Sequence, residues 1–128
     1  MSNADVVQPE VVFSFWFDEL KPEDWFKKNL SLDKDIARRF ASTHLALAEN
    51  IPDVWRASAD NVLALVIVLD QFPRNIYRGT PLAFATDGLA LKEVRAAIGA
   101  NLDQLVDERQ RQFFYMPFEH SEALDDQK

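Results

Sequence analysis

An unbroken run of eight apolar residues, from Val62 to Leu69, constrains the fold of this 128-residue chain more than any other feature. Periodicity alone cannot distinguish a buried strand from a buried helix in so short a run. No glycine or turn dipeptide flanks it, however, and the chain has no second β-rich run with which a strand could pair. Ser58 is a suitable N-cap, so we predict a buried helix from there to about Gln71.

Helical patterns also precede this run. Pro9 and Pro22 suit the first turns of two short helices, because the fixed φ of proline is compatible with that position. Ser31 is a good N-cap for a long amphipathic helix that ends near Asn50. Residues 1–8 are predicted to be a flexible N-terminus, and residues 9–128 a single helical domain.

After the run, Phe72 precedes Pro73 and should leave the helical region, so residues 73–80 are predicted to form a loop. Thr86 or Asp87 can cap a helix that extends to about residue 98. Further helices are expected at residues 107–115 and, opened by a proline, at 118–128. The sum is an all-α fold of six to seven helices without a sheet.

Composition excludes several classes of protein. The chain has no cysteine, and 21 acidic against 14 basic residues give it a net charge of −7. Nucleic-acid binding depends on clustered cations, which are absent, so neither a nucleic acid nor an anionic membrane surface is an expected partner. No apolar run approaches the length of a membrane span, and no secretory signal is evident. We therefore expect a cytoplasmic protein.

The known catalytic and metal-binding spacings are absent as well. The chain contains no glycine-rich nucleotide-binding motif and no zinc-protease motif. Neither His44 nor His120 follows a glutamate by three residues, as di-iron bundles require. We predict no metal and no cofactor.

Polar residues directly after the apolar run form the first candidate site, namely Asp70, Gln71, Arg74 and Asn75. Buried polar groups must find partners or they cost stability. One interpretation is structural, with Arg74 pairing Asp70 while Asn75 or Arg74 satisfies free carbonyls at the helix end. The other is a ligand-binding pocket floor in which Arg74 clamps an anion bidentately.

The second candidate site is the string Glu119-His120-Ser121-Glu122. Histidine is the side chain most easily tuned for proton transfer near neutral pH, so His120 is the candidate general acid or base. Glu122 is its candidate catalytic partner, Asp70 is the alternative group that would orient it, and Glu119 is a candidate ligand-binding residue. The alternative is a core histidine, or a polar first turn in which acidic residues suit the helix dipole.

Two further features are assigned to structure. The aromatic set is read as core, because aromatic side chains dominate core burial, and it consists of Phe13, Phe15, Trp16, Phe17, Trp25 and Phe26. His44 lies in the long amphipathic helix with no polar cluster around it in the sequence. We read it as an exposed or half-buried residue without a role.

Four segments together resemble a known family. They are residues 15–17, 63–75, 84–87 and 114–122, which include the strings DQFPRN and HSE. From about Pro9 to Glu122 the chain is similar to a bacterial family, the domain of unknown function numbered 924. The resemblance implies an all-helical fold like that of tetratricopeptide repeats, and it implies no reaction, substrate or catalytic residue.

The resemblance also implies that the chain is shorter at its C-terminal side than typical members. Apolar surface left uncovered by missing helices tends to be buried against another chain. We therefore expect a homodimer, or a protein partner, on that side.

Two functional hypotheses follow. The first is a helical interaction module that binds a peptide or partner helix in an apolar groove. The second is a protein or enzyme acting on a small anionic molecule through the Asp70, Arg74 and Asn75 group and the His120 and Glu122 pair. Convergence of these side chains on an open pocket would favour the second hypothesis.

Overall fold

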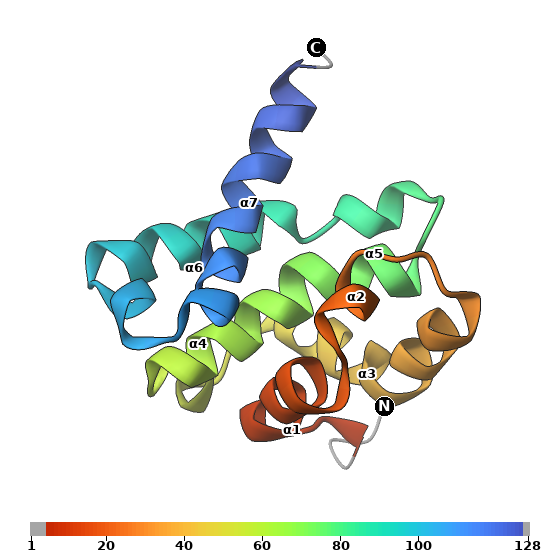
Figure 1. The fold of residues 1–128 in the computed structure, drawn as a ribbon, viewed down its shortest axis with the longest axis horizontal. Coiled ribbons are helices and arrows are strands. Elements are labelled where there is room, and N and C mark those ends of the chain that lie inside the picture. Colours follow the sequence, from red (N-terminus) through yellow and green to blue (C-terminus); the bar gives the residue numbers. More distant parts are fainter. Residues whose placement is uncertain (1–4, 127–128) are drawn as a thin grey trace.

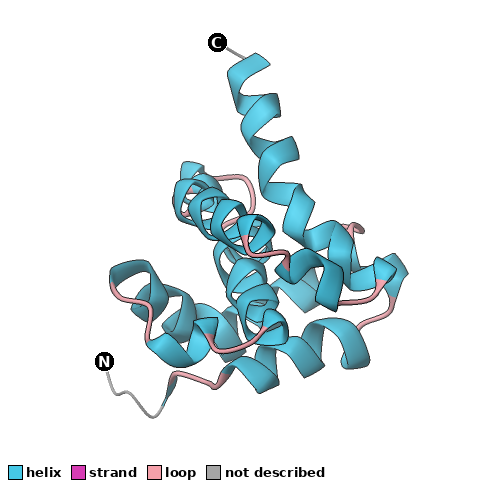
Figure 2. Cartoon of the chain, turned by 90° about the vertical axis from the view of Figure 1, so that its left-hand side faces the viewer, coloured by secondary structure: helices cyan, strands magenta, loops and turns pink. Residues whose placement is uncertain are grey.

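A computed structural model describes residues 5–126, with side chains for residues 5–121, and every regular element in that range is helical (Figures 1 and 2). The predicted all-α class is confirmed. The α-helices are α1 (Pro9–Ser14), α2 (Pro22–Trp25), α3 (Leu30–Glu49), α4 (Ala59–Val66), α5 (Phe72–Ile76), α6 (Asp87–Gly99) and α7 (Glu108–Asp126). Five short turns join them, of which η2 (Phe15–Glu19) and η4 (Ile67–Gln71) are π-helical and η3 (Asp53–Arg56), η5 (Pro81–Phe84) and η6 (Leu102–Leu105) are 3₁₀.

Local capping explains where several helices begin. Pro9 and Pro22 occupy the first turns of α1 and α2, as predicted. The hydroxyl of Ser58 accepts from the backbone N–H of Asn61 at 3.1 Å, so the predicted N-cap of α4 is confirmed. Helix α3 begins earlier than predicted, because the side chain of Asn29 rather than Ser31 caps it.

The apolar run forms the centre of the molecule. Each residue from Leu63 to Leu69 is fully buried. The backbone stays right-handed helical through Ile67 and Phe72, so α4, η4 and α5 form one continuous helix. In Figure 1 this green helix lies between α1 and α3 on one side and α6 and α7 on the other. Burial on all sides accounts for a helix without a polar face.

The central helix ends at Ile76, so the predictions of an end near Gln71 and of a loop from residue 73 are wrong. Two features offset the effect of Pro73. The N–H of Phe72 bonds to the carbonyl of Ile67, five residues back, which makes η4 a π turn. Pro73 cannot donate to the carbonyl four residues earlier, that of Leu69, but the Thr86 hydroxyl donates to it at 2.6 Å.

The prediction that Pro117 opens a new helix is also wrong, because this residue lies inside α7. Phe113, Phe114 and Pro117 are buried, and tertiary packing of this kind overrides local helix propensity. The C-terminal turns of α7 extend away from the other helices in both views (Figures 1 and 2). None of the described helices combines the length and the apolar character needed to cross a membrane.

Most of the predicted aromatic core is confirmed. Phe15, Trp16, Phe17 and Trp25 are buried and Phe13 is half-buried. Phe26 is the exception, because 61% of it is exposed. One face of the Phe26 ring stacks on Phe113, and the rest of the side chain lies at the surface.

Candidate functional site

A pocket of about 310 Å³ lies where residues from α2, η4, α5 and α7 meet. Its wall combines basic and amide side chains with two aromatic rings and a methionine. The polar lining consists of Lys27, Gln71, Arg74, Asn75, Arg78 and His120, and the apolar lining of Trp25, Phe26 and Met116. None of the described residues that line the pocket is a carboxylate. The predicted residues Gln71, Arg74, Asn75 and His120 therefore share one pocket.

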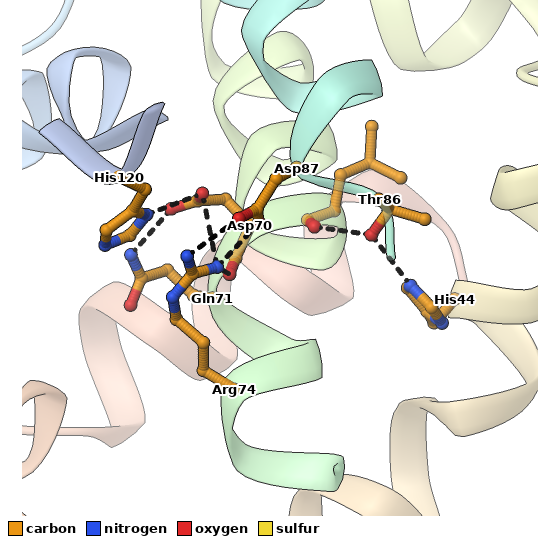
Figure 3. A network of polar contacts seen from close by, with 8 residues as sticks. His44, Asp70, Gln71, Arg74, Thr86, Asp87 and His120 are labelled. Carbon is orange, nitrogen blue, oxygen red and sulfur yellow. Dashed lines mark hydrogen bonds and ion pairs between the residues drawn. The ribbon is translucent and has the colours of Figure 1, made fainter. Parts of the chain in front are cut away.

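Asp70 lies directly behind this wall, on the π turn η4, and is fully buried. Figure 3 shows His120, Gln71 and Arg74 converging on its carboxylate. The Nδ1 atom of His120 is 2.9 Å from Oδ1, the amide of Gln71 donates to Oδ2 at 2.9 Å, and Nη1 of Arg74 lies 3.5 Å from Oδ1. Donors thus surround the Asp70 carboxylate, which can only accept.

This arrangement sets the tautomer of His120. A carboxylate accepts hydrogen bonds, so Nδ1 of His120 carries the proton that it shares with Asp70. In a neutral ring Nε2 is then an acceptor with a free lone pair. The side chain is 24% exposed and lines the pocket. His120 has the geometry of a proton acceptor held in place by a buried carboxylate.

Arg74 is held by Asp87, a partner that sequence reasoning treated only as a helix cap. Its two terminal nitrogens donate to the two oxygens of Asp87 at 2.8 and 3.0 Å. Nη1 also donates to the carbonyl of Asp70 at 2.7 Å, as the structural interpretation expects. The guanidinium fork that was predicted to clamp an anion is therefore occupied, and the Nε edge is what remains for a ligand.

Asn75 does not join the Asp70 group, because its amide donates to Asp33 on α3 at 3.0 Å. Arg78 donates two hydrogen bonds to the same carboxylate, at 2.6 and 3.0 Å. Burial alone would raise the pKa of Asp33, but the hydrogen bonds from Arg78 and Asn75 outweigh it, so this pKa is lowered. Asp33 remains an anion that orients both side chains along the pocket wall.

Of the two glutamates of the second candidate site, the structure places the side chain of Glu119 alone. Glu119 is exposed on α7 and does not line the pocket. The side chain of Glu122 lies outside the described residues. Asp70 takes the position next to His120 that the sequence reading offered to Asp70 or a glutamate.

Sequence reasoning missed Lys27, Asp33, Arg78 and Asp87. Asp33 comes from α3, more than forty positions from its partners Asn75 and Arg78. Arg78 and Asp87 lie close to the DQFPRN string, but their charges alone do not indicate pairing. No local pattern marks any of these residues, since charged residues on helix surfaces are usually solvated. Within the described part of the chain, no three histidine or carboxylate side chains gather as they would to hold a metal ion.

The reading of His44 as an exposed or half-buried residue without polar neighbours is wrong. It is 4% exposed, and its Nε2 lies 3.0 Å from the hydroxyl of Thr86 (Figure 3). That hydroxyl donates its only proton to the carbonyl of Leu69, so it accepts the hydrogen bond from His44. The Nε2 atom of His44 therefore carries a proton, and burial lowers the pKa of the imidazole, which favours its neutral form.

A pH-dependent loss of stability should follow from His44. The pKa of His44 is lowered from its ordinary value of 6.5 in the folded protein, so below pH 6.5 the unfolded chain binds a proton that the folded chain does not. The stabilising contribution of His44 to the free energy of unfolding should therefore be complete above pH 6.5. It should fall by up to about 1.4 kcal/mol per pH unit as the pH drops towards the lowered value. Urea unfolding between pH 7.5 and 4.5 measures this slope.

The control for this prediction is a His44→Leu variant, which should lose the slope in the same range. The pKa of Asp33 is lowered from its ordinary value of 3.8, so the stability change from Asp33 falls below the pH range of this measurement. An unchanged slope in the variant would assign the effect to another group.

Comparison with known proteins places the chain in a family. The family model described as bacterial protein of unknown function (DUF924) matches residues 12–128. A solved structure of a protein of unknown function from Agrobacterium tumefaciens is similar, with 41% sequence identity and a TM-score of 0.83. The match covers 88% of this chain and 63% of the Agrobacterium protein, so this chain spans less than two thirds of that protein's length. No protein with curated annotation matches the sequence.

Proposed function

The chain belongs to the bacterial family of unknown function DUF924, and from that premise we propose a function based on the pocket's own chemistry: it binds a small organic anion. The observation that carries the proposal is the wall itself. Lys27, Arg74, Arg78 and His120 line the pocket without a carboxylate among them, although the chain as a whole has a net charge of −7. Cationic groups in a cleft concentrate field lines and attract anions.

The polar groups of the wall have complementary roles. Lys27 forms no ion pair with a described residue, so its ammonium is available to donate hydrogen bonds to a bound anion. Arg74 and Arg78 are held in fixed directions by Asp87 and Asp33, so they contribute donors at little entropic cost. The Nε2 atom of His120 would exchange a proton with a bound ligand, and Asp70 is its positioning residue.

A panel of acetate, benzoate, citrate and inorganic phosphate tests this function. At least one should raise the melting temperature of the protein and give a measurable Kd by calorimetry. A Lys27→Met variant should bind that anion about tenfold more weakly or worse, because a hydrogen bond to a charged group is lost. Lys34→Met, which removes an exposed lysine outside this pocket, is the matched control. If none of the four anions binds at millimolar concentration, the proposal is contradicted.

The finer predictions from the sequence stay proposals. They are the likeness to tetratricopeptide repeats, the cytoplasmic location, the absence of nucleic-acid binding, and a homodimer or protein partner. The helical interaction module remains the second hypothesis. Leu82 and Phe84 are exposed on η5 and are the apolar side chains that a partner would contact next to Arg74.

A further inference from the structure

The charges of the pocket wall and of its ion-pair partners balance almost completely. Three fixed cations lie on its wall, namely Lys27, Arg74 and Arg78, while His120 is the fourth basic group. Behind the wall, Arg74, Arg78 and His120 pair with three carboxylates, those of Asp33, Asp70 and Asp87. The charge of this set is therefore zero when His120 is neutral and plus one when it is protonated.

This balance limits the charge of a ligand. A monoanion that binds while His120 holds a proton taken up from solvent leaves the site neutral. A dianion leaves at least one negative charge uncompensated in a partly buried pocket, which is costly. The wall attracts negative charge through the groups that it exposes, but the carboxylates behind it restrict the amount.

The apolar side of the pocket indicates the body of the ligand. Phe26 stacks one face on the buried Phe113, with ring centroids 6.0 Å apart and planes 15° apart, and 61% of the residue is exposed. Trp25 meets Phe26 edge to face at 6.4 Å and is fixed by a hydrogen bond from its Nε1 to the carbonyl of Trp16. A solvent-exposed ring held on a rigid support is a platform for another aromatic ring.

We infer that the ligand of this pocket is an aromatic monoanion, such as an aromatic monocarboxylate, whose ring stacks on Phe26 and whose charged group meets Lys27 and the Nε edge of Arg74. This inference rests on the proposed anion-binding function and specifies its substrate class. The pocket volume of about 310 Å³ accommodates a ring with a short acidic side chain. It is at the small end of the range for ligand pockets, about 300–1,000 Å³.

Four acids of related shape provide the test by calorimetry. Benzoate and indole-3-acetate should bind. Benzoate should bind about fivefold more tightly than cyclohexanecarboxylate, which has the same charge but no π-system. Isophthalate, a dianion with the same ring as benzoate, should bind no more tightly than benzoate.

Two variants assign the preference to Phe26. Phe26→Ala and Leu30→Ala each truncate a side chain that is 61% exposed, so neither should impair folding. The first should abolish the preference for benzoate over cyclohexanecarboxylate, whereas the second, outside the pocket, should retain it.

The outcomes separate the inference from the function on which it rests. Equal binding of benzoate and cyclohexanecarboxylate, or tenfold tighter binding of isophthalate, overturns the aromatic monoanion while an anion site stands. A preference that survives in Phe26→Ala also overturns it. No binding of any acid in this set or of phosphate and citrate overturns the proposed function itself.

Discussion

Replacing Arg74 by methionine should lower the free energy of unfolding by about 3 kcal/mol, the lower end of the usual effect of removing one partner from a buried charge pair, because the Arg74–Asp87 pair is partly buried. The methionine side chain has a similar length but donates no hydrogen bond. Asp87 loses both donors to its carboxylate, and the carbonyl of Asp70 loses the bond from Nη1. Urea unfolding at pH 7, with comparison of midpoints and slopes, measures the change.

The matched control is Arg38→Met. This arginine is 75% exposed and pairs with Asp35 on the surface of α3, so its loss should change stability by less than about 1 kcal/mol. An Arg74→Met, Asp87→Leu double variant should be less destabilised than the sum of the single changes, because it removes the orphaned carboxylate. Equal, small effects of Arg74→Met and Arg38→Met would show that the Asp70 network does not support the fold.

Replacing Thr86 by valine should cost about 2–6 kcal/mol, because two buried groups lose their partner at about 1–3 kcal/mol each. The two side chains have nearly the same shape, so packing is retained. The carbonyl of Leu69 loses the hydroxyl that takes the place of the missing N–H of Pro73. The Nε2–H of His44 loses its acceptor in the same step.

Thr80→Val is the control for this second change. Its hydroxyl also donates to a backbone carbonyl, that of Tyr77 at 2.8 Å, but the site is exposed and water can replace the bond. The loss there should remain below about 1 kcal/mol. Thr86→Ser should retain most of the stability of the wild-type protein. A Thr86→Val variant as stable as Thr80→Val would mean that the Leu69 carbonyl does not depend on this hydroxyl.

Part of the candidate site could be predicted from the sequence. Asp70, Gln71 and Arg74 lie within five positions of one another, on a helix whose apolar character already required its polar end to be buried. Polar groups in that position need partners, so this segment was predicted to hold interacting polar side chains. His120 was found for its chemistry, as one of two histidines in the chain.

The other members of the site come from positions without any local mark. Asp33 and Lys27 precede the central helix, and Asp87 follows it, and nothing in their neighbourhoods sets them apart from solvated surface charges. His44 was misread for the same reason, because its polar partner, Thr86, is 42 positions away. Pairing at such distances depends on how helices pack and not on spacing within one helix.

What the sequence determined by itself is the helical class and the buried central helix. Eight consecutive apolar residues have no stable place at a surface, and their burial follows from the hydrophobic effect alone. Tertiary structure decided how far that helix continues. Pro73 would end it, but the hydroxyl of Thr86 satisfies the Leu69 carbonyl, and Arg74, oriented by Asp87, satisfies that of Asp70. The pocket exists for the same reason, because its basic wall is held by carboxylates that only the folded chain brings behind it.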